Sequence, residues 1–470
     1  MFLCYFKIVN YNKLYVIILI IASIATHFIF FGYPQETVFD EVHFGKFLSG
    51  YFTHEYFFDI HPPLGKLLLS GVGYITGFEP GFSFAEIGQQ FPNKDYLWLR
   101  LLPTLAGTLL PIVIFFLVLE MGMSKLAAFF AGIAAALDGA LLVQSRFILL
   151  DSFLLIFGFS GILFYFLFRR SDKNYFLLLA GAMPALAASV KWTGLSFLTL
   201  IVIFYLFSLL KSPQKIKLLI RGFCFLGLVP LAIYFLIFKS HFLLLNKSGP
   251  GDAFMTKEFR KTLVNSTDSQ DPEIKPLNII GKFEELNIQM YKSNATLTAT
   301  HPYSSQWYTW PFMIRPIYYW NYSPTQEQTD NQETTIKEVR HSRIYLLGNP
   351  IIWWGSTVAI VYLLITTLPG LFRKSKAKMV TIFLCAGYLL NILPFIGISR
   401  AMFLYHYFPA LIFAIISLAY LVDKLNNKKR VFTTLILISV ALFIFFAPLT
   451  YGLPLSDSAY NLRNWLPSWL

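Results

Sequence analysis

The chain has 470 residues, of which 56% are hydrophobic and only 13% are charged, so a soluble globular protein is excluded and a polytopic membrane protein is predicted. The formal net charge of +13 is compatible with a nucleic-acid-binding protein. However, the basic residues stand mostly in short loops between apolar runs, which is the positive-inside pattern of membrane proteins. The cysteines, Cys4, Cys224 and Cys385, lie in or beside apolar segments, so neither a disulfide framework nor a zinc site is indicated.

Eleven apolar runs are each close to the roughly 20 residues that cross a hydrocarbon core. The first run has no small-residue cleavage site after it and is interpreted as a retained signal-anchor. The predicted spans are 14–31, 98–119, 125–143, 148–168, 174–190, 194–210, 222–242, 349–371, 379–397, 403–422 and 431–450. The fifth and sixth spans are short and could instead form one broken helical hairpin.

The basic loops predict the orientation of these spans. With a cytoplasmic N-terminus, every basic cluster falls on the cytoplasmic side of the membrane. The opposite, external face then holds two large loops, 32–97 and 243–348. The chain is therefore divided into an N-terminal transmembrane catalytic region (1–242), an external loop region (243–348) and a C-terminal transmembrane region (349–470).

The first external loop is unusually rich in titratable side chains for such an apolar chain. They are Asp40, Glu41, His43, Asp59, His61 and Lys66. Adjacent carboxylates at the membrane edge are costly to desolvate, so Asp40 and Glu41 suggest chemistry there. The alternative is an ordinary helix start, where acidic residues complement the helix dipole. The apolar spacing in this loop predicts two helices too short to span, lying flat in the membrane interface.

A membrane-face site with acids and cations suits group transfer from a lipid phosphate. Such chemistry needs a carboxylate base for the nucleophile, here Asp40 or Glu41, and cations for the departing phosphate. The phosphate-binding candidates all lie at predicted external ends of spans: Arg100, Arg146, Lys191, Arg400 and His406. The alternative for each lysine or arginine is that it snorkels to the interface without a ligand.

Several segments resemble the protein O-mannosyltransferases, in the same order and over nearly the whole chain. They are DEVHFG (40–45), YFFDIHPPLGK (56–66), RLLP (100–103), LD (137–138), QSRFILLDS (144–152), SVKWTG (189–194), HPYSSQW (301–307), GNPIIWW (348–354) and RAMFLYHYFP (400–409). The resemblance implies an all-α GT-C glycosyltransferase with about eleven transmembrane helices. It further implies transfer of mannose, with inversion, from a polyprenyl-phosphate-mannose donor to Ser or Thr hydroxyls of proteins.

The resemblance also implies roles for individual residues. The family's acidic motif falls on Asp40 and Glu41, its histidine-proline pair on His61-Pro62 and its second-span arginine on Arg100. We expect Asp40 to take the acceptor proton and Glu41 to position Asp40 or the acceptor. The expected phosphate partners are first Arg100, Lys191 and Arg400, then Arg146 and His406. The expected substrate contacts are His43, His61, His301, Tyr303 and Trp307.

The loop 243–348 looks too short for the β-trefoil MIR domain of eukaryotic members. The chain therefore resembles a prokaryotic-type member, expected in the cytoplasmic membrane with its site on the external face. An undecaprenyl-type lipid donor is then as plausible as dolichol. The expected acceptors are unfolded or translocating proteins, and the family resemblance suggests a dimer.

No cofactor is required by this chemistry, and no nucleic-acid partner is expected. A divalent cation could bind near His43, His54, His61 and His301, but no tight ligand spacing indicates one. Two other functions compete with protein mannosylation. One is the same fold acting on a lipid or glycan acceptor. The other is a secondary transporter, which needs charges within its spans, whereas the ionisable groups here lie at span ends.

Overall fold

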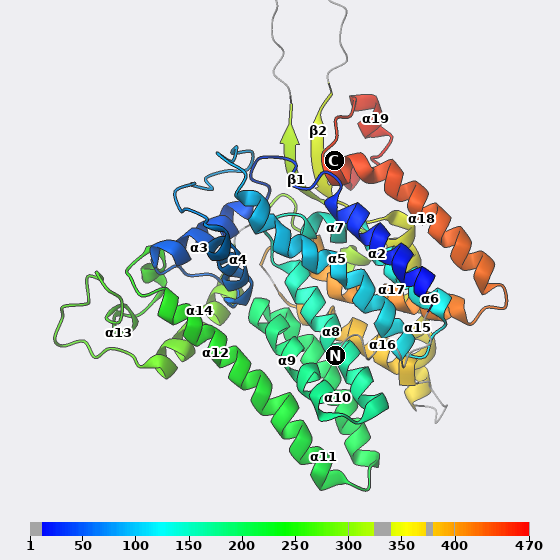
Figure 1. Ribbon diagram of the computed structural model, residues 1–470, viewed down its shortest axis with the longest axis horizontal. Helices are drawn as coiled ribbons and strands as arrows, with labels where there is room; N and C mark the ends of the chain where they lie inside the picture. Colours follow the sequence, from blue (N-terminus) through cyan, green and yellow to red (C-terminus); the bar gives the residue numbers. More distant parts are fainter. Residues whose placement is uncertain (1–11, 299, 324–339, 373–378, 399, 470) are drawn as a thin grey trace, which may run out of the picture.

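The computed structural model describes residues 12–298, 300–323, 340–372, 379–398 and 400–469. The molecule is a helical bundle with a group of short helices at one end and a two-stranded sheet above it (Figure 1). The bundle helices are α2 (Lys13–Phe28), α5 (Tyr96–Glu120), α6 (Lys125–Ala136), α7 (Gly139–Ser145), α8 (Asp151–Ser171), α9 (Asn174–Val190), α10 (Leu195–Lys211), α11 (Lys215–Gly222), α12 (Val229–Leu244), α15 (Pro350–Phe372), α16 (Met379–Leu390), α17 (Phe408–Asp423) and α18 (Lys428–Tyr451).

The bundle confirms a multi-pass membrane protein. Every predicted span corresponds to helix. Within the described residues, seven helices are long and apolar enough to cross a membrane, or eight if the bent pair α6–α7 is one span. Three other predicted spans appear as shorter apolar helices of 16, 17 and 12 residues, namely α2, α9 and α16. The count of eleven spans therefore stays a prediction.

Side-chain caps explain where the bent pair begins and breaks. Ser124 accepts a hydrogen bond from the Ala127 amide at the start of α6. Asp138 accepts one from the Leu141 amide at the start of α7, with an N–O distance of 3.0 Å. Such N-caps satisfy backbone N–H groups that have no partner within the helix. The two helices meet at an angle of 59°. The turn that follows α7 contacts the acidic pair through the Ile148 amide, which donates to Glu41.

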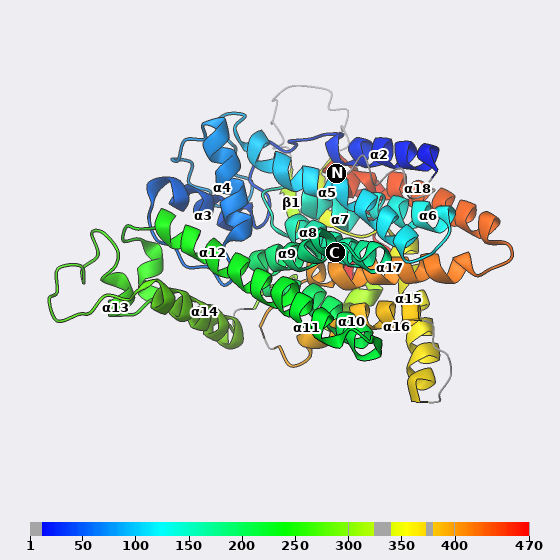
Figure 2. The same ribbon diagram turned by 60° about the horizontal axis from the view of Figure 1, so that its bottom comes forward.

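The first predicted external loop contains the two short helices that its apolar spacing predicts, α3 (Glu41–Thr53) and α4 (Leu64–Thr76). The second loop contains η3 (Pro250–Phe254), α13 (Lys257–Arg260), α14 (Ile279–Thr296) and η4 (Trp307–Phe312). In both views α3, α4, α13 and α14 lie at the same end of the bundle (Figures 1 and 2). The two loops are joined by backbone hydrogen bonds between Tyr56 and Lys247 and between Gly251 and Tyr56, each 2.9 Å long.

The strands β1 (Ile317–Tyr322) and β2 (Ser342–Leu346) form an antiparallel pair with a bulge between Tyr318 and Trp320. A bulge re-aims the side chain at which it occurs. Here the Tyr319 side chain is buried, and its carbonyl accepts a hydrogen bond of 3.2 Å from the Phe39 amide. The sheet is thereby fixed to the residue that precedes Asp40.

Candidate active site

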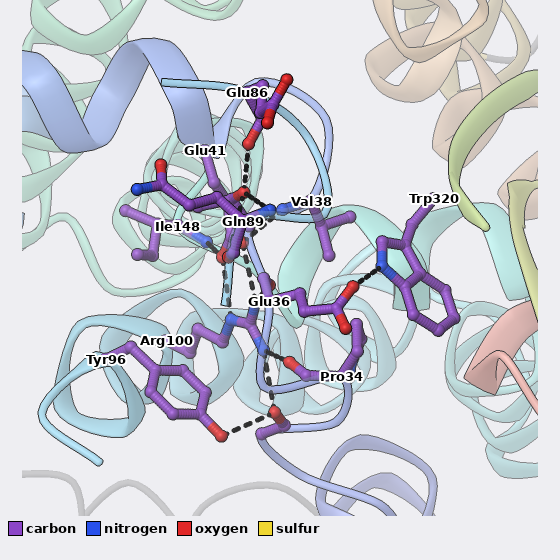
Figure 3. A network of polar contacts seen from close by, with 12 residues as sticks. Pro34, Glu36, Val38, Glu41, Glu86, Gln89, Tyr96, Arg100, Ile148 and Trp320 are labelled. Carbon is purple, nitrogen blue, oxygen red and sulfur yellow. Dashed lines mark hydrogen bonds and ion pairs between the residues drawn. The ribbon is translucent and has the colours of Figure 1, made fainter. Parts of the chain in front are cut away.

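The acidic pair divides into a buried residue and a half-buried one. Glu41 is fully buried and forms a two-pronged ion pair with Arg100, with N–O distances of 2.8 and 2.7 Å (Figure 3). The same carboxylate accepts the amides of Val38 at 2.8 Å and Ile148 at 2.9 Å. Glu41 thus joins the first loop to α5 and to the turn between α7 and α8.

Arg100 has no N–H group left over for a ligand. Beyond Glu41, its guanidinium donates to the carbonyl oxygens of Gly32, Pro34 and Glu36 at 2.6 to 2.9 Å, which occupies every N–H that an arginine carries. Its side chain is also 0% exposed. This geometry does not fit the predicted contact with a donor phosphate, and it fits a framework role instead.

Asp40 stands at the start of α3 without capping it. Among the described residues, no group donates a hydrogen bond to its carboxylate. Asp40 and Glu41 still stand at the N-terminus of α3, as the alternative of an ordinary helix start predicts. Burial raises the pKa of Asp40 to about 7, with Lys191 opposing this rise and Asp151 and Asp59 adding to it. A carboxylate with this pKa is matched to accepting a proton near neutral pH.

Lys191, one of the predicted phosphate partners, lies in the same cluster as Asp40. It follows α9 in an extended conformation, and its ammonium contacts both carboxylate oxygens of Asp151 at 2.7 and 2.8 Å. The same ammonium lies 4.9 Å from the centre of the Tyr405 ring. The interruption of the helix after α9 therefore places the Lys191 ammonium, which is fixed by Asp151, within electrostatic reach of Asp40.

Arg400, His406 and His61 belong to the same cluster of charges. Burial lowers the pKa of His61 well below its usual value, and the positive charges of Lys191, Lys66 and Arg400 add to this effect. The His406 ring is stacked between Trp310 at 5.8 Å and Tyr405 at 4.7 Å. Arg400 forms no ion pair with any described residue, so its guanidinium is available to an anionic ligand.

An apolar groove of about 600 Å³ opens beside this cluster. Its walls come from α10, the end of α14 and the segment that follows α16, and they include Leu195, Thr199, Tyr291, Leu390, Phe395 and Ile398. Arg400 and His406 also line it. A cationic end on an apolar groove suits a ligand with a phosphate head and a hydrocarbon tail.

The remaining predicted residues are not all brought to this cluster. Arg146 lies elsewhere: its guanidinium donates to the Phe30 carbonyl at 2.6 Å and covers the Tyr451 ring at 4.6 Å. The geometry therefore does not fit the predicted phosphate contact of Arg146. His43 is exposed on α3, and partial desolvation of its ring is the first cause that lowers its pKa.

The predicted aromatic contacts lie outward from Asp40. His301 meets the edge of Phe403 at 5.0 Å, and Phe403 meets the edge of Phe39 at 6.3 Å. Tyr303 follows His301 and lies 5.4 Å from the Arg315 guanidinium. Trp307 starts η4, and its ring centre lies 5.7 Å from that of Tyr308.

Sequence reasoning gave no roles to several residues of the cluster. They are Asp59, Lys66, Gln144, Asp151, Tyr319 and Tyr405. Lys66 is buried, contacts Asp59 and donates to the His61 carbonyl at 2.8 Å, which shapes the loop around the histidine. The high density of charge in 37–69 could have pointed to Asp59 and Lys66. The family-like segment 144–152 contains Gln144 and Asp151. The sequence around Tyr319 carries no comparable signal.

Across the described ranges, the structure brings no three His, Cys, Asp or Glu side chains together in a geometry that could hold a metal ion. The four histidines considered for a cation have other surroundings. His54, for example, is exposed and contacts the Leu244 carbonyl at 2.9 Å through Nδ1.

Fold and site together define a polytopic helical membrane protein that carries a cluster of charges beside an apolar groove. One family model, dolichyl-phosphate-mannose-protein mannosyltransferase, matches residues 17–246. A second, the C-terminal four-transmembrane region of protein O-mannosyltransferase, matches residues 279–469. The chain belongs to the protein O-mannosyltransferase family.

Individual relatives agree with this assignment. The chain is 34% identical over 262 residues to protein O-mannosyltransferase 1 of Drosophila melanogaster, which covers 52% of this chain and 29% of that protein. It is 33% identical over 277 residues to dolichyl-phosphate-mannose–protein mannosyltransferase 4 of Saccharomyces cerevisiae, covering 55% of this chain and 36% of the relative. The matched region thus spans only about a third of the length of these relatives.

Solved structures show the same fold. The Saccharomyces cerevisiae protein O-mannosyltransferase Pmt1-Pmt2 complex bound to the sugar donor matches with a TM-score of 0.86 at 22% identity, over 97% of this chain and 92% of that one. The archaeal oligosaccharyltransferase AglB of Archaeoglobus fulgidus matches with a TM-score of 0.52 at 14% identity, over 96% of this chain and 57% of that one. The predicted GT-C fold class is confirmed.

Proposed function

We propose that this protein transfers mannose from a polyprenyl-phosphate-mannose donor to Ser or Thr hydroxyls of proteins, with inversion at the anomeric carbon. One observation carries the proposal: the unpaired Asp40 carboxylate lies within electrostatic range of Lys191, in a cluster of charges that extends to Arg400 at the apolar groove. A base, a phosphate site and a hydrocarbon site are thereby combined. The family relationship supplies the sugar and the acceptor class.

The proposed reaction is a single displacement. The acceptor hydroxyl oxygen attacks the anomeric carbon while Asp40 takes the hydroxyl proton, and the bond from that carbon to the phosphate oxygen breaks. Polyprenyl phosphate leaves with the bonding electron pair. Lys191, Arg400 and His406 lie where they can stabilise the charge that develops on this phosphate. No protonating acid is needed, because the phosphate is already a good leaving group.

Glu41 and Arg100 act as framework in this proposal. Their buried pair fixes the backbone next to Asp40, which agrees with the expectation that Glu41 positions the base. Arg100 and Arg146 are left out of the phosphate site. Every N–H of Arg100 is bonded within the protein, and the buried Arg146 guanidinium donates to a backbone carbonyl and covers the Tyr451 ring. His43, His61, His301, Tyr303 and Trp307 are kept as candidates for contacts to sugar or acceptor.

The lipid tail is proposed to lie in the groove between α10, α14 and α16. We infer that the membrane is the cytoplasmic membrane of a prokaryote and that the site faces outward, where translocated chains emerge. Undecaprenyl and dolichyl chains both suit such a groove. The acceptor is an extended, unfolded segment, because a base held at the membrane reaches only a backbone that comes close. The yeast structure is a two-chain complex, so we expect a dimer.

The test incubates purified full-length protein with polyprenyl-phosphate-mannose and Ser/Thr peptides, with lipid and glycan acceptors offered in parallel. Mass spectrometry should show one added hexose on the peptide and release of polyprenyl phosphate. Transfer to a lipid or glycan alone would refute protein mannosylation but keep the donor assignment. Absence of transfer to every acceptor would refute the transferase itself.

A further inference from the structure

A series of hydrogen-bonded, buried side chains connects Lys191, in the cluster proposed to bind phosphate, with the strand β1. The Tyr319 hydroxyl donates to Gln144 Oε1, and Gln144 Nε2 donates to Asp151 Oδ2 at 2.6 Å. Asp151 in turn accepts from Lys191 through both oxygens, at 2.7 and 2.8 Å. These four side chains are between 1% and 7% exposed. The proposed reaction gives no role to Tyr319 or Gln144.

The donors and acceptors fix the direction of this chain. A carboxylate only accepts hydrogen bonds, so Gln144 must turn its amide NH₂ toward Asp151 and its oxygen toward Tyr319. Without the Tyr319 hydroxyl, the buried amide oxygen has no donor and the amide is free to rotate. A rotated amide would oppose an acceptor to the Asp151 carboxylate, and unpaired buried polar groups are costly.

The far end of the chain is anchored to the loop that carries the base. Phe39, directly before Asp40, stacks on the Tyr319 ring at 4.2 Å between ring centres. Its amide also donates to the Tyr319 carbonyl at 3.2 Å. The Tyr319 side chain therefore has a fixed position from which it can orient Gln144.

We propose that Gln144 is a positioning residue for the donor phosphate, oriented by Tyr319, and that it acts by holding the Asp151 carboxylate and through it the Lys191 ammonium. Asp151 touches Lys191 directly, whereas Gln144 and Tyr319 act only through another residue. The identity of the anion, a polyprenyl phosphate, rests on the proposed function. The second external loop thereby takes part in donor binding through β1.

The test measures binding of polyprenyl phosphate to the purified full chain in detergent, which needs no mannose transfer. Tyr319→Phe keeps the ring stack on Phe39 and removes only the hydroxyl. We expect its affinity for polyprenyl phosphate to fall about tenfold, the effect of one lost buried hydrogen bond. Tyr322→Phe, at a 51% exposed position of the same strand, is the matched control and should bind as the unmodified protein does.

A double variant separates positioning from a general structural role. Because Tyr319 acts through Gln144, adding Tyr319→Phe to Gln144→Leu should weaken binding no further than Gln144→Leu alone. Additive losses, an unchanged Tyr319→Phe affinity or an equal loss in Tyr322→Phe would each overturn the inference. If the variants bind polyprenyl phosphate as expected but the unmodified protein transfers no mannose, the proposed function is overturned and the positioning role of Gln144 remains.

Discussion

Asp40 differs from an ordinary surface carboxylate because it is partly desolvated, yet no residue in the described part of the chain donates a hydrogen bond to it. Its raised pKa of about 7 sets the pH response of the reaction. The base works as the carboxylate, so kcat/KM should fall about tenfold per pH unit below 7 and level off above it. The measurement is a pH profile with peptide acceptor. A profile flat down to pH 5 would contradict Asp40 as the base.

Replacing the same carboxylate tests its role directly. Asp40→Asn keeps the shape and removes the proton acceptor, so mannose transfer should drop by about 10²–10⁴-fold while donor binding persists. Transfer rate and polyprenyl phosphate affinity are measured on the same preparation. Glu79→Gln, an exposed acid in the same loop, is the control and should transfer normally. Near-normal transfer by Asp40→Asn would leave Asp40 with a structural role.

The sequence suggests that Arg100 binds the donor phosphate, whereas its ion pair with Glu41 predicts a role in stability. Arg100→Ala leaves the Glu41 carboxylate buried and unpaired, which should lower the free energy of unfolding by about 3–5 kcal/mol. Thermal unfolding in detergent measures this loss. Arg169→Ala, at an exposed site, should change stability by less than about 0.5 kcal/mol. A stable Arg100→Ala protein with weak donor binding would restore the predicted phosphate role.

At the level of individual residues, sequence reasoning named candidates but could not assign their contacts. The density of charge in 37–69 and the ends of apolar runs pointed to Asp40, Lys191 and Arg400, because such placement is costly without a purpose. The same reasoning could not separate Arg100 from Arg400. That distinction depends on a partner 59 positions away, just as the role of Gln144 depends on Tyr319, 175 positions away.

At the scale of elements, the groove depends on helices that stop short. The α9–α10 break at Lys191 and the end of α16 at Leu390 leave room between α10, α14 and the segment after α16. Apolar periodicity locates these helices, yet it does not say which pair leaves a gap. The sheet was equally hidden, since two short strands that lie far apart in the sequence have no distinctive spacing.

The groove leads to a prediction about lipid length. Thr199 is an exposed residue of α10 that lines the groove. Thr199→Trp should fill the space for the tail and weaken binding of a long polyprenyl phosphate, while a short-chain analogue binds as before. Competition between the two lipids measures the change. Equal weakening of both lipids would mean that the tail lies elsewhere.

At the scale of the whole molecule, contact between the two large loops agrees with their predicted common face. The predicted topology places this face outside the cell. In a chain whose native cysteines are replaced, a membrane-impermeant thiol reagent should label Ser83→Cys and Thr267→Cys in intact cells. Gln214→Cys, in a predicted cytoplasmic loop, should stay unlabelled until the membrane is opened. Labelling of Gln214→Cys alone would reverse the topology.

The Glu41–Arg100 pair has a consequence for the life of the protein before it is complete. The network around it joins the segment 32–41, the second span and the Ile148 amide, so it closes only after all three have been inserted. Until then the backbone next to Asp40 lacks the anchor that Glu41 provides. Assembly of the chain up to Ile148 is thus a condition for a well-positioned Asp40, before the later residues of the site are added.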